Sequence, residues 1–116
     1  MLTTHVLDTT HGRPGAGMAV TLLRQTGRGE FDPVRAVVTN ADGRCDGPLL
    51  AGDDAATGRY RLVFAVGAYF RGLGIALPDP SFLEDVPIDF GIADTDQHYH
   101  VPLLVSPYGY STYRGS

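Results

Sequence analysis

The last nineteen residues, His98 to Ser116, hold most of the side chains in this chain that could do chemistry. His98 and His100 are separated by one residue, so on a strand both imidazoles would point to the same side. The alternate positions are all apolar and suit a core: Tyr99, Val101, Leu103 and Val105. Because histidine titrates near neutral pH, two imidazoles side by side are suited to proton transfer.

A turn and a second strand are predicted to follow. The segment Ser106-Pro107-Tyr108-Gly109 is typical of a turn, because proline presets φ at the second position. A strand over 110–115 would then run back antiparallel to the first. If this end of the chain is held in place, its arginine, tyrosine, serine and terminal carboxylate lie near the histidines.

The paired histidines could also bind a metal or simply face solvent. A closed metal site needs four ligands and a catalytic one usually three. His5, on a predicted strand over 2–9, is the only obvious third ligand, and Cys45 is an isolated thiol. We therefore expect no metal and no other cofactor, and solvated histidines on an exposed sheet face are the simpler alternative.

Motifs for a nucleophile or a phosphate loop are absent. The chain has no Gly-x-Ser-x-Gly segment, and Cys45 has no predicted helix N-terminus or neighbouring base that would lower its pKa. Gly27 and Gly29 do not precede a predicted helix, so they do not form a phosphate-binding loop.

Length and charge exclude several classes of protein. A chain of 116 residues predicts one domain, over 1–116, with enough surface buried to form a core. The net charge of −4 and nine scattered arginines argue against a nucleic-acid partner. No apolar run approaches the ~20 residues of a membrane span. The first residues lack a signal-peptide pattern, so we expect a cytoplasmic protein.

Eight short strands and one short helix are predicted to position these side chains. The strands are expected at 2–9, 18–24, 33–39, a short stretch from Arg44, 59–66, 86–92, 98–105 and 110–115, and the helix at 68–73. Residues 10–17 are predicted to form a loop, and Asn40-Ala41-Asp42-Gly43 a tight turn. Strands of this length with regular turn signals indicate an all-β fold, a two-sheet antiparallel sandwich.

Several segments resemble the 5-hydroxyisourate hydrolases, the transthyretin-related enzymes of urate breakdown. They are HVLD from His5, the G-R-P that follows, NADGR ending at Arg44, TGRYRLVF at 57–64 and HYHVPLLVSPYGYSTYRGS from His98. They occur in the same order over nearly the whole chain. The resemblance implies a transthyretin-like sandwich of eight strands and one short helix. It also implies a homotetramer, a dimer of dimers with a central channel.

The resemblance also implies which residues form the site. His5, Arg44 and His100 would be catalytic, and Tyr113, Arg114, Gly115 and Ser116 would bind substrate, all at the interface between dimers. In transthyretin the first three positions are lysine, glutamate and threonine. Tyr113 would close the depth of the channel and leave a shallow pocket for a small purine. His98 matches a position with a less direct link to catalysis.

The resulting hypothesis is a hydrolase that opens 5-hydroxyisourate to 2-oxo-4-hydroxy-4-carboxy-5-ureidoimidazoline without a cofactor. His100 is expected to be the general base and His5 its acid or orienting partner, with Arg44 and Arg114 holding an anion. Ser116 and its carboxylate would position substrate or water. Three alternatives are a transthyretin-like carrier of an aromatic ligand, a sandwich module that mediates protein contacts, and a zinc hydrolase.

Overall fold

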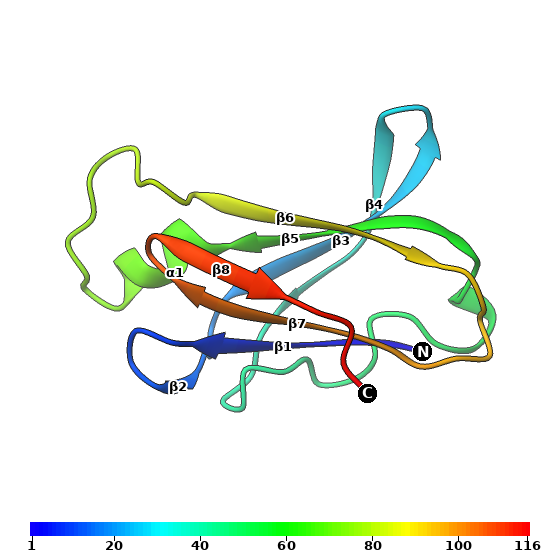
Figure 1. Ribbon diagram of the computed structural model, residues 1–116, viewed down its shortest axis with the longest axis horizontal. Coiled ribbons are helices and arrows are strands. Elements are labelled where there is room, and N and C mark those ends of the chain that lie inside the picture. The colour runs from blue at the N-terminus through cyan, green and yellow to red at the C-terminus, as the bar shows by residue number, and fades with distance from the viewer.

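Two four-stranded sheets make up the protein, which is described over residues 1–116 by a computed structural model (Figure 1). The strands are β1 Leu2–Asp8, β2 Arg13–Pro14, β3 Ala19–Gly27, β4 Glu30–Val38, β5 Gly58–Ala65, β6 Asp85–Ile92, β7 Tyr99–Ser106 and β8 Gly109–Thr112. One α-helix, α1 Val66–Gly72, follows β5, and a short 3-10 turn, η1, spans Gly52–Asp54. The predicted all-β sandwich with eight strands and one short helix is confirmed.

The strand order is β2-β1-β7-β8 in the first sheet and β4-β3-β5-β6 in the second. All neighbours in the second sheet are antiparallel, but β1 and β7 in the first sheet run parallel, with Thr3 opposite His100. The predicted two-sheet antiparallel sandwich is therefore confirmed, with this one parallel pair as the departure. A parallel pair needs a long connection, and here residues 9–98 supply it by crossing to the other sheet.

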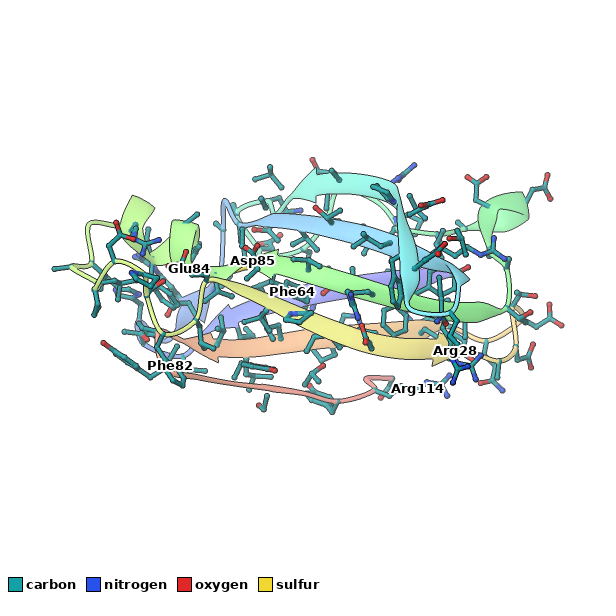
Figure 2. The ribbon with its side chains drawn as sticks, turned by 90° about the horizontal axis from the view of Figure 1, so that it is seen from above. Arg28, Phe64, Phe82, Glu84, Asp85 and Arg114 are labelled. Carbon is teal, nitrogen blue, oxygen red and sulfur yellow. The ribbon has the colours of Figure 1, made fainter.

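The core lies between the two sheets and follows the two-residue period of the strands. On β1 the buried side chains alternate with half-buried ones, so Leu2, Thr4, Val6 and Asp8 point inward while Thr3, His5 and Leu7 point outward. On β7 the predicted inward face of Tyr99, Val101, Leu103 and Val105 is buried, as expected. Phe64 of β5 lies between the layers near the centre of the molecule (Figure 2). The histidines of β1 and β7 are thereby placed on the outer face of the first sheet.

Several predicted elements differ from the structure. The short strand from Arg44 is an isolated bridge between His5 and Arg44, and residues 13–14, predicted as loop, form the two-residue strand β2. Val66 was predicted to end a strand but begins α1, which therefore starts two residues before the predicted helix at 68–73. The last strand ends at Thr112, not at residue 115, and only Gly115 returns to the sheet, through a bridge to His100.

A buried carboxylate joins β1 to α1 at the end of the sheet away from His100. The side chain of Asp8 is inaccessible to solvent, and its Oδ2 accepts hydrogen bonds from Tyr69 Oη (2.7 Å) and His11 Nδ1 (2.6 Å). Burial acts to raise the pKa of Asp8, but the hydrogen bonds from His11 and Tyr69 outweigh it and hold the pKa below its usual value. No helix of this protein has the length and apolar character that crossing a membrane requires.

Candidate active site

A polar pocket of about 500 Å³ lies on the outer face of the first sheet. It is formed by β1, β7, the residues after the 40–43 turn and the end of the chain. Among its lining side chains are Thr3, Arg44, Cys45, His98, His100 and Ser116. The structure therefore brings Arg44, His100 and Ser116 together in one pocket, although they are far apart in the sequence. His5 does not line this pocket and is joined to it through its bridge to Arg44.

Arg44 reaches this face because a tight turn carries it to β1. Gly43 N donates to Asn40 O, and Asn40 Oδ1 accepts from the backbone N–H groups of Asp42 and Arg44, so the predicted turn at 40–43 is confirmed. Gly43 has φ of +73°, and a Cβ there would meet Val6 O at 2.4 Å, so the close approach to β1 requires glycine. Arg44 then forms the bridge with His5.

His5 is held in one tautomer by the same turn. Its Nε2 lies 3.0 Å from the carbonyl oxygen of Asp42. Because a carbonyl can only accept, Nε2 carries the hydrogen, and in the neutral ring Nδ1 keeps a free lone pair. Burial and the nearby Arg44 guanidinium lower the pKa of His5, while the bond to Asp42 acts in the opposite direction.

His100 lies beside His98 and opposite Thr3 on the neighbouring strand. The two imidazoles are nearly parallel, with ring centroids 6.3 Å apart, and Thr3 Oγ1 contacts His100 Nδ1 at 2.8 Å and His98 Nε2 at 3.1 Å. Burial, then Arg44, His5 and His98, lower the pKa of His100. His5 and His100 are therefore both neutral at pH 7 and able to accept a proton.

Arg44 supplies a positive charge that no carboxylate neutralises. The ion pairs of the chain join His11 to Asp8, Arg61 to Asp89 and Arg71 to Glu84, and none includes Arg44. A guanidinium without a partner beside neutral imidazoles is available to bind an anion or an oxyanion.

The terminal tetrapeptide divides between two pockets. Gly115 N donates to His100 O at 2.7 Å, which places Ser116 in the polar pocket. Tyr113 and Arg114 instead line a separate pocket of about 420 Å³ next to β6. The Arg114 guanidinium lies 4.2 Å above the Tyr99 ring and donates to Gln97 Oε1 and to the carbonyl oxygen of His98. Within one chain, Arg114 is thus turned away from Arg44 and His100.

Several residues of the pocket were not predicted from the sequence, and Thr3 and Cys45 are the two with side chains able to do chemistry. Thr3 shares the outward face of β1 with His5, so the strand period could have pointed to it, but threonine is too common on strands to stand out. Cys45 follows Arg44 after an irregular segment whose path the sequence does not define. Burial raises the pKa of the Cys45 thiol, with a further contribution from Asp46. Nowhere do three His, Cys, Asp or Glu side chains gather in a metal-binding arrangement.

Comparison with known proteins gives a consistent result. The model of the HIUase/Transthyretin family matches residues 2–115. The 5-hydroxyisourate hydrolase 2 of Rhizobium meliloti is 63% identical over 99% of this chain and 95% of its own length. The structure of Klebsiella pneumoniae 5-hydroxyisourate hydrolase superposes with a TM-score of 0.80 at 37% identity, covering 99% of this chain and 98% of that one. Sea bream transthyretin in complex with thyroxine gives a TM-score of 0.87 at 28% identity, covering 98% and 93%.

Proposed function

The chain belongs to the HIUase/Transthyretin family, and we propose that it is a 5-hydroxyisourate hydrolase whose reaction takes place in the polar pocket. The high identity to curated enzymes of that name over nearly the whole chain supports this activity. The observation that carries the proposal is the meeting of His100 and the unpaired Arg44 guanidinium in that pocket, with His5 joined to Arg44 by a backbone bridge. Burial and the Arg44 charge lower the pKa of both imidazoles.

The proposed reaction opens the ring by hydrolysis of a cyclic amide-type bond. His100 Nε2 removes a proton from water, whose oxygen adds to the ring carbonyl carbon. Arg44 stabilises the oxyanion that forms, and the C–N bond then breaks as the nitrogen accepts a proton. The attacked carbon becomes a carboxylate that remains part of the single ring-opened product, 2-oxo-4-hydroxy-4-carboxy-5-ureidoimidazoline. His5 was expected to be the acid or the orienting partner; because its Nε2–H is bonded to the Asp42 carbonyl and its Nδ1 carries no proton, the orienting role is proposed here.

The end of the chain is proposed to bind the substrate. Ser116 lies at the polar pocket, so its hydroxyl and terminal carboxylate are available to position substrate or water. Tyr113 and Arg114 face away from this pocket within one chain. Their proposed binding role therefore depends on how subunits meet.

We also propose a homotetramer, a dimer of dimers. The pocket opens on the outer face of one sheet, and such an open surface excludes little water. On the same face Leu7 and Leu104 lie opposite each other on β1 and β7 and are only half-buried. A facing sheet from another subunit would cover this apolar pair and enclose the pocket, which strengthens the electrostatic interactions inside it.

A carrier function has less support from this pocket. Binding sites for aromatic ligands are lined mainly by apolar side chains, whereas only one hydrophobic residue lines the polar pocket. A cytoplasmic location and independence from a cofactor, both expected from the sequence, stay predictions.

The activity is tested by following the near-UV decay of freshly generated 5-hydroxyisourate with and without protein. Acceleration is expected for the wild type, and equal rates would remove the enzyme hypothesis. His5→Ala, Arg44→Ala and His100→Ala should each lower the rate by ~10²-fold or more, as for lost acid–base or oxyanion-binding groups. All three side chains lie outside the core, so the variants should keep the fold, as checked by circular dichroism.

A further inference from the structure

Thr3 connects two imidazoles into one hydrogen-bonded row. Its Oγ1 lies 2.8 Å from His100 Nδ1 and 3.1 Å from His98 Nε2. The strand register produces this arrangement, because Thr3 is opposite His100 on the neighbouring parallel strand and His98 is two residues earlier on the same side. Both imidazoles line the polar pocket, but His100 is partly buried whereas His98 is exposed, so the row leads from a half-buried ring to an exposed one.

The number of N–H and O–H protons limits the ways in which the hydrogen bonds of His98, Thr3 and His100 can be arranged. The threonine hydroxyl has one proton to donate, and each neutral imidazole has one N–H. Both bonds form in only two ways. In the first, Thr3 donates to His98 Nε2 and accepts from His100 Nδ1–H, so His100 Nε2 is a free base. In the second, Thr3 donates to His100 Nδ1 and accepts from His98 Nε2–H, so His100 Nε2 carries a proton.

The surroundings of His100 disfavour an imidazolium there. Burial, the Arg44 guanidinium, His5 and His98 all lower its pKa. A base that gained a proton on Nε2 and kept Nδ1–H would place a positive charge next to these groups. Passing the Nδ1 proton onward as Nε2 is protonated keeps the ring neutral and moves the charge to the exposed end of the row.

We propose that Thr3 and His98 form a proton relay behind His100, a proposal that rests on His100 being the general base. The O–H bond of the attacking water breaks as His100 Nε2–H forms. The Nδ1 proton of His100 passes to Thr3 Oγ1, and the hydroxyl proton of Thr3 passes to His98 Nε2. His98, the more exposed ring of the row, becomes the imidazolium.

The same relay returns the proton for the second half of the reaction. His100 Nε2–H protonates the leaving nitrogen while His98 Nε2–H passes its proton to Thr3 and Thr3 passes its own to His100 Nδ1. Every proton is conserved, and the row is restored to its first arrangement without another reactant. Thr3 and His98 are positioning residues, since they act through His100.

The test compares Thr3→Val, which removes the hydroxyl at nearly constant shape, with Thr3→Ser, which keeps it. Thr3→Val should lower kcat by ~10- to 10²-fold with little change in KM, and Thr3→Ser should recover most of the loss. His98→Gln should lower kcat in the same range. Thr10→Val, a change of an exposed turn residue outside the pocket, is the matched control.

A readout specific to proton transfer separates the relay from simple orientation of the ring. The solvent isotope effect on kcat, measured across H₂O/D₂O mixtures, should be large and curved in the wild type and in Thr3→Ser, but smaller and linear in Thr3→Val. An unchanged curve in Thr3→Val, or wild-type kcat in that variant, would overturn the relay and leave the hydrolase assignment intact. A wild-type protein that does not accelerate hydrolysis would contradict the proposed function itself.

A second readout does not depend on activity. The ¹⁵N chemical shifts should show that, of His100 Nδ1 and His98 Nε2, one nitrogen carries a proton and the other does not. In Thr3→Val this link should be lost while the amide spectrum of the other residues is retained. Identical imidazole shifts in the folded wild type and Thr3→Val would rule out the shared hydroxyl.

Discussion

At the scale of single residues, the charge of Arg44 influences the protonation of the two neighbouring histidines, His5 and His100. Arg44 is beside both His5 and His100. The burial of each imidazole and the charge of Arg44 together lower the pKa of both rings below the ordinary value of 6.5. A lowered pKa means that the neutral, proton-accepting form persists to a lower pH. The same cation that is proposed to bind the oxyanion therefore also favours the proton-accepting form of His100, the proposed general base.

Arg44→Gln should raise the pKa of His5 and His100, because it removes a neighbouring positive charge and keeps much of the side-chain volume. The midpoints are measured by NMR titration of the imidazole Cε1 protons. Arg28→Gln, at the exposed tip between β3 and β4, is the control and should leave both midpoints unchanged. Midpoints that stay in place in Arg44→Gln would mean that burial alone lowers these pKa values.

At the scale of elements, the end of the chain is fitted to the ring of His100. Gly115 forms a bridge to His100, and a Cβ on Gly115 would meet His100 Cδ2 at 2.5 Å and Cγ at 3.2 Å. Such a contact cannot be accommodated without moving the ring or the terminal segment. The absence of a side chain at 115 therefore sets the position of both His100 and Ser116.

Gly115→Ala is expected to lower the hydrolysis rate by ~10-fold or more through displacement of the ring, while the unfolding midpoint changes little because the segment lies outside the core. Gly72→Ala is the matched control, since a Cβ at Gly72 meets no atom within 4 Å. Removal of residues 114–116 should likewise affect activity more than stability. Full activity after either change would argue against a role of the terminal motif.

The opposite end of β1 is expected to govern stability instead of activity. Burial, followed by the hydrogen bond to Asp8, raises the pKa of Tyr69 to about 12, so the phenol remains a donor to the buried carboxylate. Tyr69→Phe removes this donor and should lower the free energy of unfolding by about 1–3 kcal/mol, as measured in urea. Tyr108→Phe, which alters an exposed ring, should have no effect.

The loss in Tyr69→Phe should depend on pH in a defined direction. The folded-state pKa of Asp8 is lowered, so the stabilisation by its ionised form is complete above the ordinary carboxyl value of 3.8 and is lost as pH falls through the folded value. The difference in the free energy of unfolding between the wild type and Tyr69→Phe should therefore become smaller as the pH falls below 3.8. If the difference in the free energy of unfolding stayed constant as the pH was lowered below the pKa of Asp8, ionised Asp8 could not be the acceptor of this hydrogen bond.

At the scale of the whole molecule, the two faces of the first sheet have different tasks. The inner face packs in the core, and the outer face carries Thr3, His5, His100 and the pair Leu7–Leu104. Figure 1 marks both chain ends on the same side of the sandwich, and Ser116 at the C-terminus lines the polar pocket. One sheet thus supplies both histidines of the proposed site and the surface proposed to meet another subunit.

Sedimentation should give a tetramer for the wild type. Leu104→Glu places a charge on the outer face of β7 and should shift the protein toward dimers, with loss of activity in proportion. Val34→Glu changes an exposed residue of β4 in the other sheet and should leave the tetramer intact. A fully active monomer would exclude a site that needs a facing subunit.

The sequence alone was sufficient for those features that depend on local pattern. The two-residue period predicted the inward and outward faces of β1 and β7, and turn residues predicted the turns at 40–43 and 106–109. The family resemblance then selected His5, Arg44 and His100. The predicted strand lengths and the predicted start of α1 were less accurate. The hydrogen bonds at which an element ends are made with residues distant in the sequence.

Only the tertiary structure decided which side chains meet. The parallel pairing of β1 with β7 places Thr3 against His100, and no local pattern encodes the register of strands separated by some ninety residues. The bridges from Arg44 and Gly115 likewise arise from irregular segments whose paths depend on packing. Sequence period thus determined which way each residue points, because that is a property of one strand. The hydrogen bonds between strands determined what each residue contacts.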